Sequence, residues 1–163
     1  MKSPSVDEVI RMLDRRNGSE VGANEIRLQK QYGLDNLVGA YVEAFSQIKN
    51  WAGRMHIMFW IRRYARSNPS VVEVAKLGLS DRSRIVRTYS CSALAYALDK
   101  SSIPDLKTLL DHNDETTRGD AVAAIRAIEM QNHHLWADRQ ETGKCYWVVN
   151  PEDDPRGIVS AND

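Results

Sequence analysis

The chain has 163 residues, of which 42% are hydrophobic and 27% are charged. This composition is ordinary for a globular protein that buries a full core, and it excludes a chain that is disordered throughout. The two cysteines, Cys91 and Cys145, are too few and too far apart for a disulfide framework or a zinc motif, so a reducing compartment fits best.

The first residues lack the apolar run of a signal peptide, because Asp7, Glu8 and Arg11 interrupt it. No stretch approaches the ~18 uninterrupted apolar residues of a membrane span. The longest apolar run, residues 55–61, is broken by His56. We therefore expect a cytoplasmic protein with no membrane contact.

The formal net charge of zero hides an uneven distribution. Residues 49–87 contain nine Lys and Arg against two Asp and Glu, whereas residues 88–163 contain seven against thirteen. The centre of the chain is therefore basic and its C-terminal half acidic, which bears on its partners and not on its fold.

Helix signals follow one another along the first part of the chain. Ser5, with a glutamate three positions later, predicts the start of a helix, and Asn17 with the glycine after it predicts its end. A weaker helix is expected over residues 21–32. Asp35 is a good N-cap for the next helix, and apolar spacing predicts another over residues 51–66.

An internal repeat begins in the middle of the chain. Residues 79–94 align with residues 110–125, and each copy predicts a short helix, a polar turn and a longer helix. The clearest repeats cover residues 69–98 and 103–130. The matched positions are Leu79 with Leu110, Arg87 with Arg118, Ala93 with Ala124, and Leu94 with Ile125.

A more diverged copy precedes these two, and it aligns Arg54 with Arg87. Large residues such as Trp60 replace small ones there, which suits an end unit that no identical neighbour covers. We expect one α-helical repeat domain over residues 1–150 and a flexible acidic tail over residues 151–163.

These residues resemble a HEAT repeat, and in particular the short HEAT-like repeats of phycobilin lyases and many bacterial proteins. The pattern is carried by Leu79, Asp81, Val86, Arg87, Ala93 and Leu94. The second copy departs from it with His112 for the turn aspartate and Thr117 for the valine. The resemblance covers residues 69–130, with a weaker extension back to residue 35. It implies an all-α fold, an α-α superhelix of about three helical hairpins with N-terminal helices and a C-terminal extension.

The resemblance also implies a role for the repeated arginines. In HEAT-like proteins this arginine commonly pairs with the turn aspartate of its own or the next repeat. Arg54, Arg87 and Arg118 are then a structural ladder, with Asp81 and Asp114 as available acids, because buried arginine needs a partner that accepts its hydrogen bonds. The alternative is that these arginines bind a ligand.

The basic centre supplies candidate partner-binding residues, which are Arg62, Arg63, Arg66, Arg84, Tyr89 and Tyr96. Arg62 and Arg66 are four positions apart and share one helix face. Tyr89 and Tyr96, seven apart, would add aromatic anchors beside them. Two alternatives stay open: an ordinary solvated surface, or a basic strip that acidic residues 152–154 cover. We call the following residues the basic strip: Lys49, Arg54, Arg62, Arg63, Arg66, Arg82 and Arg84.

Other polar and aromatic residues suggest little chemistry. His133 and His134 point in different directions on a helix, and no ligand spacing completes a metal site around them. The four tryptophans are expected in the core or at the ends of the repeat stack. Residues 145–149 are expected to form an extended segment over one end of that stack. The sequence has no nucleophile elbow, phosphate-binding loop or dinucleotide fingerprint.

These observations favour a non-catalytic binding protein without a cofactor. HEAT-like proteins mostly scaffold, inhibit or carry partners, and small bacterial examples include immunity proteins that neutralise toxins. A single protein partner, such as a toxin, is therefore our first hypothesis. A nucleic-acid-binding protein of the DNA-repair type is the second, because the basic strip suits phosphates. A phycobilin lyase is the third.

Overall fold

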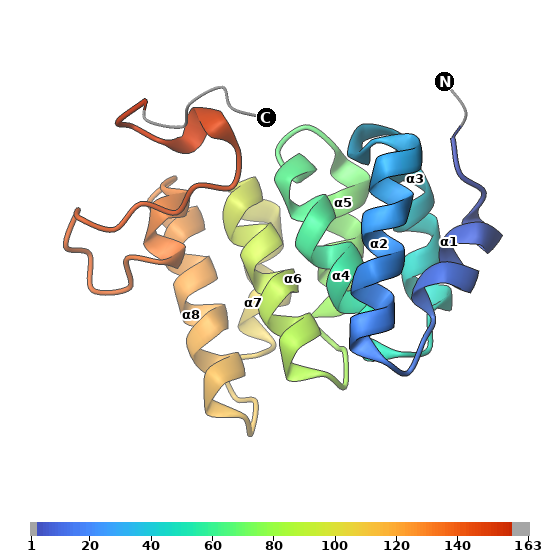
Figure 1. Ribbon diagram of the computed structural model, residues 1–163. Helices are drawn as coiled ribbons and strands as arrows, with labels where there is room; N and C mark the ends of the chain where they lie inside the picture. Colours follow the sequence, from blue (N-terminus) through green and yellow to red (C-terminus); the bar gives the residue numbers. More distant parts are fainter. Residues whose placement is uncertain (1–2, 158–163) are drawn as a thin grey trace.

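The computed structural model describes residues 3–157, and within them the chain is all-α, with no strand. Figure 1 shows the helices side by side in chain order, with the C-terminal segment at the end opposite the N-terminal helices. The α-helices are α1 (Val6–Leu13), α2 (Gly18–Tyr32), α3 (Leu34–Ala44), α4 (Trp51–Ile61), α5 (Pro69–Gly78), α6 (Arg84–Ala97), α7 (Ile103–Lys107) and α8 (Glu115–Glu129).

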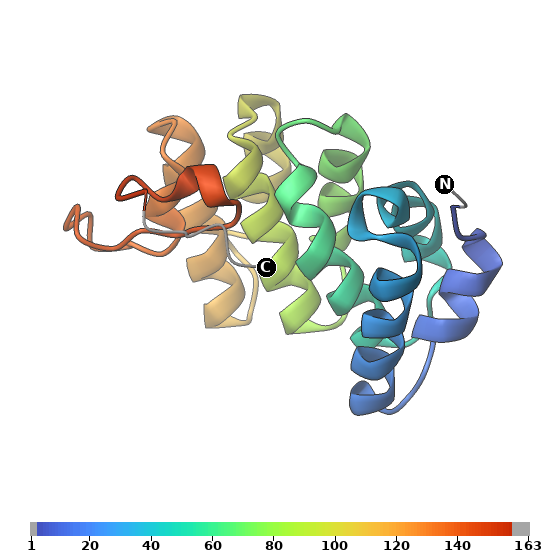
Figure 2. The ribbon, with the colours of Figure 1, turned by 45° about the horizontal axis from the view of Figure 1, so that its top comes forward.

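The helices are arranged as hairpins whose second members pack against one another. Helix α3 packs on α4, α5 on α6, and α7 on α8, while α2, α4, α6 and α8 contact each other in succession. Figures 1 and 2 both show these four helices lying side by side. The all-α prediction is therefore confirmed, and the two longest predicted repeat helices, α6 and α8, begin at the expected residues.

Several predicted boundaries were wrong, and each error has a local cause. Asn17 does not stop a helix but starts α2, because its side chain accepts hydrogen bonds from the N–H groups of Ser19 and Glu20. Helix α3 starts before Asp35, whose carboxylate instead accepts from the hydroxyl of Tyr64. The expected helix over residues 51–66 ends at Ile61 and tightens into a 3-10 turn over Arg62–Tyr64.

Small residues let the hairpin helices approach closely, as the repeat pattern predicts. Ser90, Ala93, Ala121 and Ala124 are all fully buried. A Cβ placed on Gly78 would lie 2.0 Å from the Ser90 hydroxyl, so α5 and α6 are in direct contact at this point. Close approach of this kind supports the tight packing of neighbouring helices.

The three repeated arginines occupy equivalent places at the starts of α4, α6 and α8. Each donates from its Nη1 to two backbone carbonyls in the turn before its helix, at distances of 2.6–3.1 Å. Arg54 also forms a bidentate ion pair with Asp81, at 2.5 and 3.0 Å. Arg87 reaches Asp114 at 3.4 Å and the Thr117 hydroxyl at 3.0 Å.

Both ion pairs span the same sequence distance, since each arginine meets an acid 27 positions further on. Arg118 is different, because Cys145 stands 27 positions after it. Its side chain is hydrogen-bonded only to the carbonyls of His112 and Asn113 among residues 3–157. The arginines therefore connect one hairpin to the next as far as α8, the last hairpin helix.

Candidate functional site

The residues of the basic strip lie at two opposite ends of the layer formed by α2, α4, α6 and α8, the second helices of the hairpins. Arg54 at the start of α4 meets Asp81 just before α6, while Arg66 beyond the end of α4 donates to the carbonyl of Tyr96 at the end of α6. The two helices therefore run in the same direction. Arg84 starts α6, twelve residues before Tyr96, which corresponds to about 18 Å along a helix. Arg84 thus lies away from Arg66, whereas Tyr89, which Arg62 contacts, is only five residues, about 7.5 Å along the helix, beyond Arg84.

Arg62 is held against three aromatic side chains. Its guanidinium carbon lies 4.3 Å from the ring centre of Phe59, 5.4 Å from that of Tyr89 and 5.6 Å from that of Trp147. The guanidinium makes no hydrogen bond or ion pair within residues 3–157. Burial among the rings lowers the pKa of Arg62 from its ordinary value, with Tyr89 opposing and Arg63 adding to the shift.

The aromatic cluster continues beyond α6 through the C-terminal part of the chain. Trp147 lies 6.0 Å from Trp136, and the guanidinium of Arg139 lies 5.0 Å from the Trp136 ring. Arg139 is fixed there by an ion pair of 2.7 Å with Asp120, which is buried and also accepts from Thr88. We call the following half-buried or exposed residues the aromatic–arginine surface: Phe59, Arg62, Tyr89, Trp136, Arg139 and Trp147.

Arg63, the next residue, packs over the Trp60 ring at 5.2 Å. Its Nε is buried and has no hydrogen-bond partner within the described chain. Arg62 and Arg63 are thus adjacent, half-buried arginines without an acid, whereas Arg66 already has one. Aromatic contacts hold both side chains in place, which reduces the conformational entropy that a partner must remove on binding.

The C-terminal segment, residues 145–157, runs back across the ends of α8 and α6 towards α4 (Figure 2). Trp147 donates its backbone N–H to His134, 3.1 Å away, and packs edge-on against Tyr96. Asn150 donates to the carbonyl of Arg63 at 3.0 Å and to the hydroxyl of Tyr96 at 2.8 Å. The segment therefore connects α8, α6 and the turn after α4.

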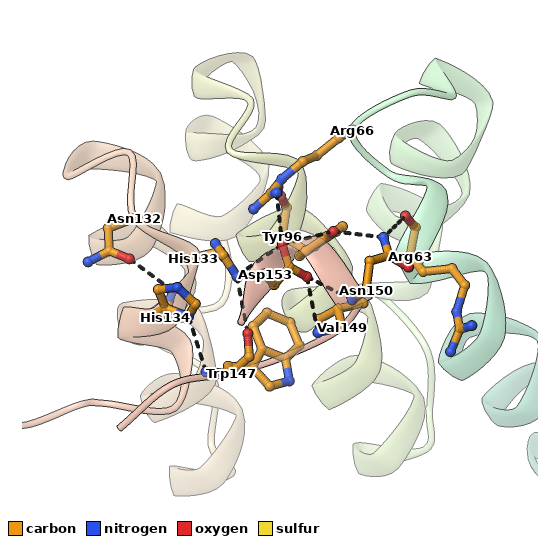
Figure 3. Close-up of polar contacts among 10 residues, drawn as sticks. All are labelled: Arg63, Arg66, Tyr96, Asn132, His133, His134, Trp147, Val149, Asn150 and Asp153. Atoms are coloured by element: carbon orange, nitrogen blue, oxygen red, sulfur yellow. Dashed lines mark hydrogen bonds and ion pairs between the residues drawn. The ribbon is translucent and has the colours of Figure 1, made fainter. Parts of the chain in front are cut away.

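Asp153 is the centre of this contact (Figure 3). Its carboxylate accepts from the N–H groups of Val149 and Asn150, from the Tyr96 hydroxyl at 3.3 Å, and from Arg66 at 3.1 Å. Burial acts to raise the pKa of Asp153, but the two backbone N–H donors and the other contacts outweigh it, so the pKa lies below its ordinary value. The carboxylate is therefore held in its charged form.

Two sequence-based assignments need correction here. Tyr96 is only 1% exposed, so it is not a surface anchor for a partner. Instead, its side chain packs against Trp147 and accepts a hydrogen bond from Asn150 of the C-terminal segment. The tail expected to be flexible from residue 151 is instead packed at its start, since Asp153 and Asp154 are buried. This packing matches the alternative in which residues 152–154 cover the basic strip. Within the described chain, however, Arg66 is the one residue of the strip that forms an ion pair with this segment, through Asp153. Residues 158–163 of the expected tail lie outside the described residues.

Acid is expected to release the C-terminal segment through His133. Burial lowers the pKa of His133 from 6.5 to about 4, helped by His134 and Arg66, while Asp153 and the Trp147 carbonyl oppose the shift. The released state then takes up a proton on this histidine before the packed state does. Packing should therefore weaken as pH falls from 6.5 towards 4.

The indole N–H resonance of Trp147, followed by NMR across that range, measures this release. His133→Gln removes the titrating group and keeps a hydrogen-bond donor for the Trp147 carbonyl, 3.1 Å away. We expect the variant to keep its segment packed down to a lower pH. An unchanged transition in His133→Gln would show that another group controls it.

Sequence reasoning missed four of the six residues of the aromatic–arginine surface, namely Phe59, Trp136, Arg139 and Trp147. The tryptophans were expected in the core or at the ends of the stack, but Trp60, Trp136 and Trp147 are only partly buried against the core, and Trp51 is 47% exposed. The available signal was the extended segment expected at residues 145–149. That expectation placed a tryptophan near the repeat stack without saying which helix it would reach.

The sequence matches no known protein-family model, and no curated protein is similar to it in sequence. No helix within residues 3–157 has the length and apolar character needed to cross a bilayer. The same residues contain no group of three or more His, Cys, Asp or Glu side chains placed to hold a metal ion.

Proposed function

We propose that this chain is a non-catalytic binding protein, a HEAT-like α-α superhelix that binds one protein partner through the aromatic–arginine surface. Within that class, it acts as a small cytoplasmic inhibitor of the immunity type, and its partner is a toxin. The proposal rests on one observation above all: Arg62 has three aromatic neighbours and no acid.

The chemistry of the surface supports this role. Trp, Tyr and Arg dominate the energetic centres of protein interfaces, because they combine large contact area with directed polar groups. The guanidinium of Arg62 can donate two parallel hydrogen bonds to a carboxylate, and the surrounding rings shield that pair from water. We therefore expect the partner to present an Asp or Glu surrounded by apolar side chains.

Nucleic-acid binding remains the second candidate, because aromatic rings interleaved with arginines also suit stacked bases and phosphates. Two features favour a protein instead. Asp120 and Asp153 lie among these basic residues, which weakens the attraction for a polyanion. The separation of Arg84 from Arg66, at opposite ends of α6, also interrupts the continuous positive path that a phosphate backbone needs.

The proposal predicts that Arg62→Glu weakens binding of the partner about 30-fold or more, the effect of losing a central anchor and introducing repulsion. The test has two steps. A crosslinking amino acid at position 148, an exposed residue next to Trp147, first identifies a protein that the chain contacts at this surface. Calorimetry with that purified protein then compares the wild-type chain, Arg62→Glu, and Lys107→Glu, an equal charge change at an exposed position on α7.

Equal affinities for the wild-type chain and Arg62→Glu would remove this surface from the site. A labelled oligonucleotide measured at low and high salt tests the second candidate. Binding that falls steeply with salt and is lost in Arg62→Glu would establish the nucleic-acid function in place of the proposed one.

A further inference from the structure

A separate groove lies at the other end of the same helix layer, between the starts of α4 and α6. Its volume is about 400 Å³, enough to receive a large side chain and its neighbours. We call it the rim groove. It is lined by Lys49, Asn50, Trp51, Arg54, Arg82, Ser83 and Ile85.

The lining of the rim groove includes two exposed apolar side chains. Trp51 is 47% exposed and Ile85 is 39% exposed, although each belongs to the first turn of a helix whose next turns are buried. Single exposed apolar residues are common on protein surfaces. Two of them in one concavity are less so, and they provide a place for an apolar side chain of another molecule.

The charges around the groove favour an acidic occupant. Lys49, Arg82 and Arg84 are exposed, and none of them forms an ion pair within residues 3–157. The nearby acids are already engaged by the protein: Asp81 is bound by Arg54, and Asp14 accepts from the backbone N–H groups of residues 49 and 50. Asp114 likewise accepts from Thr117.

We propose that the rim groove is a second docking site, which binds an acidic segment of a protein through one apolar anchor. The anchor lies between Trp51 and Ile85, and flanking carboxylates pair with Lys49, Arg82 and Arg84. On α6, Ile85 of the rim groove lies four residues, about 6 Å along the helix, before Tyr89 of the aromatic–arginine surface. The site does not depend on the proposed function, since it shares no residue with that surface.

A peptide fits the groove better than a nucleic acid does. Ile85 cannot stack on a base as an aromatic ring can, so an apolar side chain is its natural neighbour. Lys49 and Arg82 line one concavity, and Arg84 lies in the chain between the lining residues Ser83 and Ile85, which suits a few carboxylates beside a central anchor.

The test uses the full isotope-labelled chain and a short synthetic peptide with glutamates on both sides of a central Leu-Phe pair. Four tryptophans provide four indole N–H signals in NMR, so each surface has its own reporter. We expect the peptide to shift the Trp51 signal. The double variant Arg82→Glu and Arg84→Glu should weaken this binding about tenfold or more, while Lys107→Glu should leave it unchanged.

Two control peptides test separately the contributions of the apolar anchor and of the acidic side chains. Replacing Leu-Phe by Ser-Ser should abolish the Trp51 shift, and so should replacing every glutamate by lysine. The inference is wrong if Trp51 does not respond, if either control peptide binds equally well, or if an oligonucleotide shifts Trp51 when the acidic peptide does not. A shift at Trp147 alone would support the aromatic–arginine surface and overturn the rim groove, so the two proposals fail separately.

Discussion

Arg87→Ala is expected to lower the free energy of unfolding by about 3 kcal/mol, the upper end of the range for leaving buried acceptors without their donor. Arg87 is only 7% exposed. Its guanidinium donates hydrogen bonds to two backbone carbonyls, to the Thr117 hydroxyl and to the Asp114 carboxylate. Truncation leaves these acceptors without their donor in a site that water reaches poorly. Urea unfolding followed by circular dichroism measures the loss.

Arg118→Ala is the matched control for this prediction. Arg118 occupies the same place at the start of α8 and serves the same kind of carbonyl pair, but it has no acid partner in the described chain. We expect a loss of about 1 kcal/mol, typical of ordinary hydrogen bonds. If the two variants were equally destabilised, the connection between hairpins would contribute nothing beyond the local turn.

Asp153→Asn should release the C-terminal segment and leave the helices folded. The carboxylate has four donors, and an amide cannot accept from all of them, so the packed state should lose at least about 2 kcal/mol. We expect faster hydrogen exchange at the N–H groups of Trp147, Val149 and Asn150, with unchanged exchange in α6. Exchange measured by NMR would show both effects.

Glu152→Gln provides the control for Asp153→Asn, because it removes the same charge from an exposed neighbouring residue. It should leave the segment packed. If Glu152→Gln released the segment as well, general attraction to the arginines would hold it, and the specific contacts of Asp153 would not. Released Trp147 would also leave Arg62, so the first variant should weaken partner binding through the aromatic–arginine surface.

The repeat spacing predicted which residues occupy equivalent places in successive hairpins. The alignment of Arg54, Arg87 and Arg118 was visible because the residues that fix it are local to each hairpin. The starts of α1, α6 and α8 were predicted correctly, whereas Asp35 was wrongly predicted to cap α3. Asn17 was misread because the same residue type ends one helix and caps the next, and only the direction of its side chain distinguishes the two.

The candidate site was harder to predict, because long-range packing creates it. Phe59 and Tyr89 meet through helix packing, and Trp147 arrives from the C-terminal segment. Helical periodicity predicted that Tyr89 and Tyr96 share one helix face. It could not predict that the C-terminal segment covers Tyr96 and leaves Tyr89 partly exposed. An acidic, proline-containing composition suggested a loose tail, whereas the hydrogen bonds of Asp153 hold its first residues in place.

The constant spacing of the two ion pairs also indicates where the chain tolerates changes of length. The repeated arginines are 33 and then 31 positions apart, while both arginine-to-acid distances are 27. The turn before each arginine has a constant length, because each of the three binds the carbonyls six and five positions before it. The difference of two residues therefore falls between an arginine and the following turn, and the acid lies six positions before Arg87 but four before Arg118. A hairpin grafted into this protein would keep the carbonyl contacts if its length varied only between an arginine and the following turn, which makes that stretch the natural junction for building longer or shorter chimeras.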